Sequence, residues 1–254
     1  MEQNRKPIVI LGPMESESEY LIEQLNDPTM LKVGAYRYVS GRIDGYPVIV
    51  GRTYIGMVNA ATATALAIER FDPLTVIIQG TSGAHDPALH QGDIILGENI
   101  VELGSYYTSH RDPGDGSRYT AWTQPGAEIL TDGALSRVNV LHSDPRILEI
   151  AAAVPYPHGK VRRGTIGAAD IWNRELDMIA HLHSKLSTDC EEMEGFAVAQ
   201  VCVQMGVPCA DVRIISNSEW HEDEPFDESY GQFCQEFCLD LLHRMIDSLT
   251  TDHS

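Results

Sequence analysis

The stretch that decides the fold is "CEEMEGFAVAQVCVQMGVPCADVRIISNSEW", residues 190–220. Residues 192–206 carry apolar side chains at helical spacing, and Gly206 followed by Pro208 is a typical helix end. Residues 209–216 form a mainly apolar run that predicts a buried strand. Open α/β sheets bind ligands at the carboxyl ends of their strands. We therefore expect functional side chains in the polar segment 216–219, "SNSE", that ends this strand.

The rest of the chain alternates between strand-like and helix-like segments. Strands are expected over 7–12, 74–80 and 92–101, and helices over 58–71 and 226–249. Asp44-Gly45 separates two strand-like runs and predicts a hairpin. Residues 109–126 are rich in Gly, Pro and charge and predict a long surface loop. Without an internal repeat or a low-complexity linker, residues 1–254 predict a single α/β domain with a mixed sheet between helices.

The composition excludes several classes of protein. Apolar residues make up 43% and charged residues 22%, which is ordinary for a soluble globular protein. The apolar run before Gly12 is too short for a signal peptide or a membrane span, so we expect a cytoplasmic protein that does not associate with membranes. The net charge of −19 argues against nucleic acid as a partner, because binding phosphates requires a basic face.

Neither cysteines nor histidines indicate a metal site. The five cysteines are an odd number and predict reduced thiols; two of them, Cys234 and Cys238, lie one helical turn apart and predict apolar packing. The segment "WHEDE" (220–224) contains His221 and three acids, but it lacks the paired histidines of a helical zinc site. We expect an acidic solvated loop there, no metal and no cofactor.

Four polar stretches follow strands or precede helices: "GPMESESE" (12–19), "GTSGAHDP" (80–87), "EEMEG" (191–195) and "SNSE" (216–219). Each alone has a structural interpretation, as a charged helix N-terminus, a glycine-rich turn or a helix cap. Together they supply what is needed to cleave a ribosyl bond. That reaction requires a carboxylate that activates water, groups that bind the ribose hydroxyls and a group at the leaving base.

In this order, with "TYIGMVNAA" (53–61) between the first two, these motifs resemble the nucleoside phosphorylase/nucleosidase superfamily over about residues 7–247. They are most similar to its 5′-methylthioadenosine/S-adenosylhomocysteine nucleosidase branch, and the "EMEG" helix start combined with "VRIIS" is a highly specific pair. The resemblance implies a three-layer α/β/α sandwich around a mixed, partly barrel-like sheet. It also implies a homodimer that hydrolyses the N-glycosidic bond of a purine nucleoside.

The resemblance also implies roles for individual residues. Glu17 matches the carboxylate that activates the attacking water, and Arg213 and Thr81 match positions that help to hold that water. Met193 and Glu194 match the ribose-binding pair. Trp172 falls where the family stacks an aromatic ring on the base, although a core aromatic is an equally good interpretation. The expected substrate site further includes Ser82, Gly83, Asn173, Glu192 and Ser216.

This chain departs from the family pattern at two places. One bears on whether water or phosphate attacks the sugar, and the other bears on the 5′ group of the substrate. Phosphorylases of the superfamily bring arginines to the phosphate, but this chain has Ile78 at one of those positions and Glu15, Ser16 and Glu17 in the loop that supplies the other. Carboxylates would repel phosphate, so we expect hydrolysis. The loop 102–112, with Tyr106 and Tyr107, is the candidate wall for the 5′ substituent and departs most from the family.

Asn217 stands where the nucleosidase pattern has the Asp that protonates N7 of adenine. An amide can donate or accept a hydrogen bond, but it cannot act as a general acid. Several interpretations remain open: a 6-oxopurine substrate, whose O6 and N7 Asn can bind; a slow adenine nucleosidase; a substitution introduced to trap a ligand; or a nucleoside-binding protein without turnover. A phosphorylase acting on the same nucleosides is a further alternative.

Overall fold

The computed structural model describes residues 5–251. Its strands are β1 (Ile8–Gly12), β2 (Asn26–Val33), β3 (Tyr36–Ile43), β4 (Tyr46–Arg52), β5 (Thr75–Ala84), β6 (Ile94–Glu102), β7 (Ala127–Thr131), β8 (Ala134–Val138), β9 (Val140–His142), β10 (Val161–Ala168), β11 (Cys190–Glu192) and β12 (Cys209–Ser218). Its α-helices are α1 (Glu19–Glu23), α2 (Met57–Phe71), α3 (Pro145–Ala152), α4 (Leu176–Leu186), α5 (Gly195–Met205) and α6 (Tyr230–Thr251). Short 3-10 helices occupy Glu15–Glu17 and Tyr119–Ala121.

The main sheet is mixed and closes on itself. Its strand order is β11-β10-β6-β12-β5-β1-β4-β3-β2, and β11 also pairs with β5. The additional pairing closes β5, β12, β6, β10 and β11 into a five-stranded barrel, from which β1, β4, β3 and β2 extend as an open sheet. The barrel brings the carboxyl ends of β5 and β12 beside the short strand β11.

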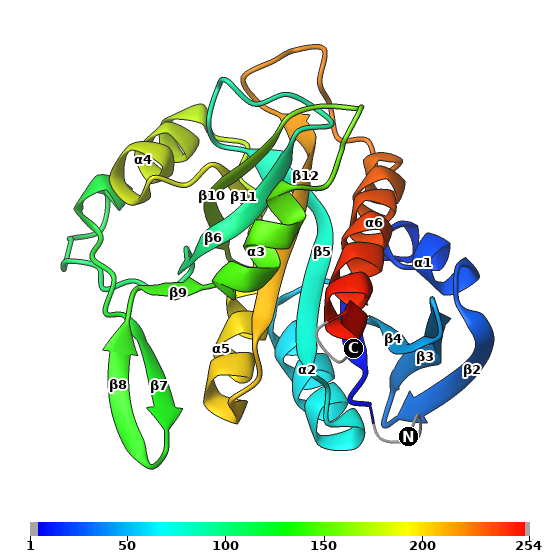
Figure 1. Cartoon of the computed structure of the whole chain (residues 1–254). Coiled ribbons are helices and arrows are strands. Elements are labelled where there is room, and N and C mark those ends of the chain that lie inside the picture. The colour runs from blue at the N-terminus through cyan, green and yellow to red at the C-terminus, as the bar shows by residue number, and fades with distance from the viewer. Residues whose placement is uncertain (1–4, 252–254) are drawn as a thin grey trace.

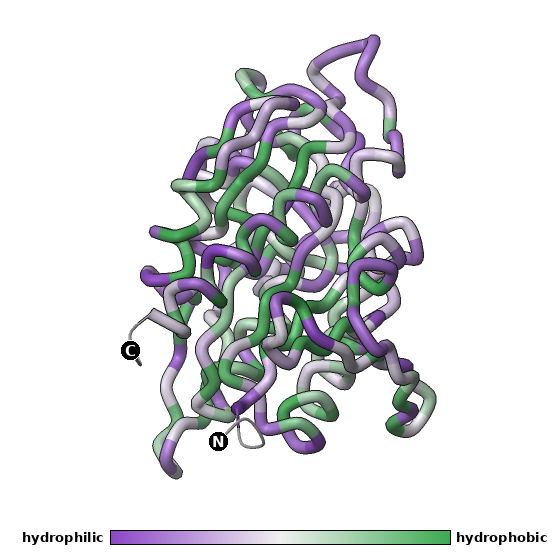
Figure 2. Tube along the Cα trace, turned by 45° about the vertical axis from the view of Figure 1, so that its right-hand side comes forward, coloured by the Kyte–Doolittle hydropathy of each residue, from purple (hydrophilic) through white to green (hydrophobic). Residues whose placement is uncertain are grey.

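Helices cover both faces of the sheet, as Figure 1 shows. On one face α1, α3 and α6 contribute Leu21, Ile147 and Phe237 to a core with the strands. On the other face α2 and α5 contribute Ala60 and Phe196 to a second core. Hydrophobic residues line the central strands, whereas the outer loops are mostly hydrophilic (Figure 2). The predicted three-layer sandwich around a partly barrel-like sheet is confirmed.

Most predicted elements are present with shifted ends. The hairpin at Asp44-Gly45 joins β3 and β4, and both turn residues have positive φ. Residues 109–126 form the predicted exposed loop apart from one 3-10 turn. The hairpin β7–β8, which projects from the body of the protein in Figure 1, was not expected. None of the helices within residues 5–251 is long and apolar enough to cross a membrane.

One structural alternative, the glycine-rich turn at 80–83, and the predicted start of one helix were wrong. The segment "GTSG" (80–83) is not a turn, because β5 continues through it to Ala84 and pairs with β12 and β11. The helix expected from residue 192 begins at Gly195, because Cys190–Glu192 pairs with β5 and β10 as β11. In both places strand pairing supplies partners for the backbone groups and overrides the local pattern.

Candidate active site

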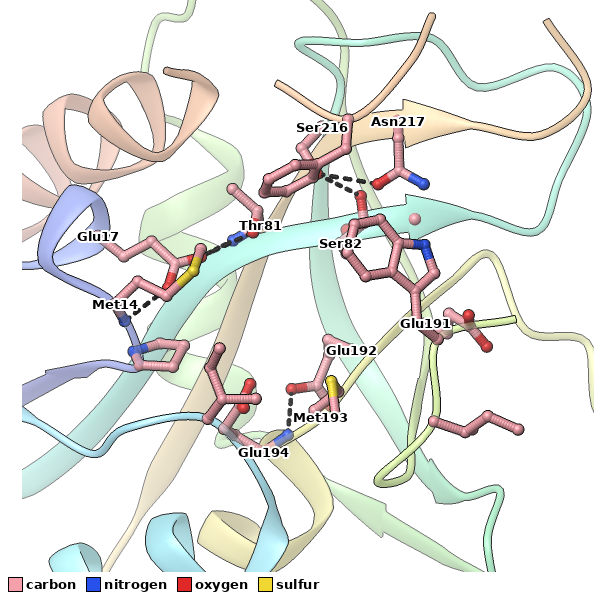
Figure 3. A pocket seen from close by; sticks show the side chains of 16 residues that line it. Met14, Glu17, Thr81, Ser82, Glu191, Glu192, Met193, Glu194, Ser216 and Asn217 are labelled. Atoms are coloured by element: carbon pink, nitrogen blue, oxygen red, sulfur yellow. Dashed lines mark hydrogen bonds between the residues drawn. The ribbon is translucent and has the colours of Figure 1, made fainter. Parts of the chain in front are cut away.

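A pocket lies where β1, β5, β11 and β12 end. Its walls come from seven stretches of the sequence, and Figure 3 shows their side chains around the pocket. The lining residues are Pro13, Met14, Glu17, Ile55, Thr81, Ser82, Gly83, Ile171, Trp172, Glu191, Glu192, Met193, Glu194, Ser216, Asn217 and Phe226. Four of these side chains are carboxylates, and the described lining has no Lys, Arg or His.

Glu17 lies at the end of the 3-10 helix that follows β1, and it is buried. Its Oε1 accepts hydrogen bonds from the backbone N and the hydroxyl of Thr81, both at 2.7 Å, and its Oε2 accepts one from Met14 N at 2.9 Å. Burial raises the pKa of this carboxyl, and the hydrogen bonds from Thr81 partly oppose the rise. A fixed carboxylate with a raised pKa is suited to take a proton from water.

Glu194 caps the start of α5 and lies close to Gly56. Its Oε1 accepts a hydrogen bond from Gly56 N at 2.8 Å, which ties the loop before α2 to the pocket. Burial raises the pKa of Glu194, and Arg213 opposes the rise. Met193 precedes it on the pocket wall. A buried carboxylate beside a thioether offers one acceptor and one apolar contact to a bound molecule.

Arg213 lies behind the pocket rather than in its wall and is completely buried. Its guanidinium donates to Asp211 Oδ1 at 2.8 Å, and it lies 2.5 Å from Glu192 Oε2 and 3.5 Å from Glu194 Oε2. Burial raises the pKa of both Asp211 and Glu192, and the charge of Arg213 opposes the rise. Arg213 is therefore a counter-ion for the carboxylates of Asp211, Glu192 and Glu194 behind the pocket wall.

Asn217 lies near the end of β12, next to Ser216 and opposite Gly83. Its Oδ1 accepts a hydrogen bond from the Ser216 hydroxyl at 3.1 Å. The Ser216 Oγ also lies 3.2 Å from the Ser82 carbonyl, and Ser82 donates to the Ile214 carbonyl. The Asn217 Nδ2 group lies next to Gly83, where a Cβ would be 3.2 Å from it.

Apolar side chains form the mouth of the pocket. Trp172 is 51% exposed and packs edge-on against Phe226 with ring centroids 5.2 Å apart. Ile55 and Ile171 are also exposed and complete this wall. The core-aromatic interpretation of Trp172 is wrong, because half of its surface is exposed at the pocket.

The sequence analysis missed Glu191. Its carboxylate is buried in the pocket wall, where Oε1 accepts from Asn173 N at 2.6 Å and Oε2 accepts from Asn173 Nδ2 at 2.5 Å. His85 Nε2 lies 3.0 Å from Oε2. Asn173 itself is not in the lining and supports Glu191 from behind. The only sequence signal was the pair of adjacent glutamates in "EEMEG". Both lie in strand β11, where successive side chains point to opposite faces of the sheet.

The structure places the remaining candidates as follows. Thr81, Ser82, Gly83, Glu192 and Ser216 all lie in the pocket wall with Glu17 and Asn217. Tyr106 and Tyr107 do not line the pocket within one chain; Tyr106 packs against Trp122. In the "WHEDE" loop, His221 stacks on His90, and His90 Nδ1 lies 2.8 Å from Glu224 Oε1. These three side chains are the one group within the described residues that could reach a common metal ion.

Residues 7–247 match the family described as the Phosphorylase superfamily. The chain belongs to the phosphorylase superfamily. Among the curated members, the 5′-methylthioadenosine/S-adenosylhomocysteine nucleosidase of Tolumonas auensis is 30% identical over 88% of this chain and 91% of its own length. The nucleosidase of the same name from Anoxybacillus flavithermus is 28% identical over 95% of this chain and 98% of its own length.

A solved superfamily structure has the same fold. The 5′-methylthioadenosine/S-adenosylhomocysteine nucleosidase of Neisseria meningitidis, in complex with methylthio-immucillin-A, superposes with a TM-score of 0.75. The match covers 93% of this chain and 98% of that one, at 23% identity. The superfamily assignment, which the motifs had predicted, is thus confirmed by sequence and by fold.

Proposed function

We propose that this protein hydrolyses the N-glycosidic bond of a purine ribonucleoside and releases the free base and the ribose. The observation that carries the proposal is the placement of Glu17 on one side of the pocket and Asn217 on the other, with Met193 and Glu194 on a third side below them (Figure 3). A base bound near Asn217 would leave from the face of the sugar opposite Glu17. The relatives named above as nucleosidases support the same reaction.

The proposed reaction needs only groups of this chain and water. As the bond between C1′ and N9 breaks, its electron pair moves to the purine and positive charge develops on the ribosyl ring. The Glu194 carboxylate stabilises that cation. A water molecule adds to C1′ and gives a proton to Glu17, while the departing purine takes its proton from solvent, because Asn217 has none to give.

Water is favoured over phosphate as the acceptor. Among residues 5–251, four carboxylates and no basic side chain line the pocket, and the cation behind it, Arg213, is already surrounded by Asp211, Glu192 and Glu194. A phosphate ion in this pocket would meet negative charge on several sides. Ile78, which stands where a phosphorylase has an arginine, is buried in β5.

The experiment is to incubate the protein with methylthioadenosine and methylthioinosine in parallel, with and without phosphate, and to measure the free base. We expect release without phosphate and a ribose rather than a ribose 1-phosphate as product. Release that depends on phosphate would make the protein a phosphorylase, and no release of either base would favour a nucleoside-binding protein. The homodimer, the single domain over 1–254, the cytoplasmic location and the 5′ substituent stay predictions.

A further inference from the structure

We propose that this protein binds one divalent transition-metal ion of the zinc class through His90, His221 and Glu224, outside the nucleoside pocket. None of these three side chains lines that pocket. They come from two loops, the β5–β6 connection over 85–93 and the β12–α6 connection over 219–229, so the ion would join the two loops. Metal binding there would require neither a nucleoside nor turnover.

The fold brings together ligands that the sequence separates. The segment "WHEDE" contains His221 and Glu224 but a single histidine, which is why the sequence predicted no metal there. The second histidine, His90, lies 134 residues before Glu224, and its Nδ1 is 2.8 Å from Glu224 Oε1. The His90 ring also stacks on that of His221, with centroids 4.4 Å apart. The three side chains offer ligand atoms that all lie within 4.8 Å of one another. Two imidazoles and a carboxylate are an established ligand set for zinc.

Hydrogen bonds to the backbone hold two of the ligands in forms that bind a metal. His221 Nε2 lies 3.1 Å from the Pro87 carbonyl, which can only accept, so Nε2 carries the hydrogen and Nδ1 keeps the lone pair. Metal-binding histidines commonly donate their second nitrogen to a backbone carbonyl in this way. Glu224 Oε2 accepts from Gln91 N at 3.2 Å, which leaves Oε1 for an ion. A neutral imidazole and an ionised carboxylate are the forms that coordinate zinc.

The ligand atoms need only small movements to reach the spacing around zinc. With bonds of about 2.0–2.2 Å, tetrahedral ligand atoms lie about 3.4 Å apart. The separation is now 2.8 Å between His90 and Glu224 and at most 4.8 Å for the other pairs. The His90 side chain is 53% exposed, so its ring can rotate to adjust these distances without disturbing the core. With three protein ligands, a water molecule would complete the coordination.

The charge around the site also suits a cation. Among the ion pairs formed by residues 5–251, the partner of Glu224 is His90, and no Lys or Arg neutralises this carboxylate. Glu222 and Asp223 are exposed next to it in the sequence and add negative charge. Imidazole nitrogens favour Zn²⁺, Ni²⁺ and Cu²⁺, whereas Mg²⁺ and Ca²⁺ prefer oxygen ligands. The two histidines therefore indicate a zinc-class ion rather than Mg²⁺ or Ca²⁺.

The test is isothermal titration of the full chain with ZnCl₂, after treatment with EDTA and without a histidine tag. We expect one zinc ion per chain with a Kd of about 10 μM or below. Because the ion binds a site that only the folded chain assembles, saturating zinc should raise Tm by at least about 3 °C. MgCl₂ and CaCl₂ at the same concentrations should neither bind nor raise Tm.

Variants assign the binding to these side chains. His90→Gln removes an exposed ligand and keeps a group that can hydrogen-bond to Glu224, so the variant should fold, and we expect zinc affinity to fall by at least about 10-fold. Glu224→Gln should lower it by a similar factor. The matched control is His243→Gln, at an exposed histidine paired with Asp44, which should leave zinc affinity unchanged. The proposal is overturned if zinc does not bind, if His90→Gln binds it as tightly as the wild type, or if Mg²⁺ displaces it.

Discussion

Glu17 is held by three hydrogen bonds, and the proposed reaction depends on its ability to accept a proton. Replacement by Gln keeps the size and the contacts at Oε1 but removes the base. We expect Glu17→Gln to lower kcat by about 10²–10⁴-fold while nucleoside binding changes little. Glu15→Gln, at an exposed carboxylate in the same segment, is the control. Initial rates and calorimetric titration measure the two effects, and unchanged turnover in Glu17→Gln would remove this residue from the mechanism.

The pH dependence of the reaction follows from the same carboxyl group. Burial raises the pKa of Glu17 above its ordinary value of 4.5. Only the ionised form can accept the proton of water, so kcat/KM should be constant at high pH and fall about tenfold per pH unit below the raised pKa. A pH–rate profile measures this limb. A limb at or below pH 4.5 would contradict the effect of burial on Glu17.

Asn217 lacks the acid that an adenine leaving group needs. Asn217→Asp supplies one, but a second carboxylate beside Glu191 would repel it, so the prediction is made in the Glu191→Gln background. There we expect Asn217→Asp to increase adenine release from methylthioadenosine by about 100-fold. The matched control is Asn139→Asp, at an exposed position away from the pocket. If adenine release does not rise, the missing acid is not what limits the reaction on adenine nucleosides.

At the scale of the element, the sequence predicted the strands and helix that carry the pocket better than it predicted the contacts between the pocket's side chains. Strand ends at "VRIISNS" and "GTSG" and the acids of "EMEG" indicated where the pocket would be, because hydrophobic runs and their polar ends are local signals. Glu191 could not be recognised in this way. Its role depends on a three-residue strand pairing with β5 and on His85 and Asn173 approaching from elsewhere in the chain. Long-range pairing of this kind leaves little trace in a single sequence.

Strand β12 carries part of a buried cluster of charge. Arg213 is surrounded by Asp211 on its own strand and by Glu192 and Glu194 at the β11–α5 junction. Replacing it by Met would leave three buried carboxyls without their cation, and we expect a loss of about 3–5 kcal/mol in the free energy of unfolding. Arg163→Met, which removes a surface partner of Glu98, should cost less than about 1 kcal/mol. Denaturant titration measures both.

The same variant should have a characteristic pH dependence. Burial already raises the pKa of Asp211 to about 7 with Arg213 present, and removing the cation raises it further. The folded variant then binds more protons than the unfolded chain, so its stability increases as the pH is lowered from 8 to 6. A stability that falls over this range would show that the carboxyls are not what destabilises Arg213→Met.

For the molecule as a whole, the open question is how the mouth of the pocket is covered. Tyr54, Ile55 and Val58 are 42%, 51% and 76% exposed at the start of α2, and Ile55 also lines the pocket. In the predicted homodimer a second copy would bury these side chains by an isologous contact and supply a wall for the 5′ group.

We therefore expect Val58→Glu to convert the dimer to a monomer and to raise KM by about 10-fold or more, since an uncovered apolar group loses more than about 1 kcal/mol of burial. Leu135→Glu, on the projecting hairpin and 63% exposed, should do neither. Light scattering after gel filtration gives the mass of each variant. A wild type that is monomeric and fully active would mean that one chain completes the site alone.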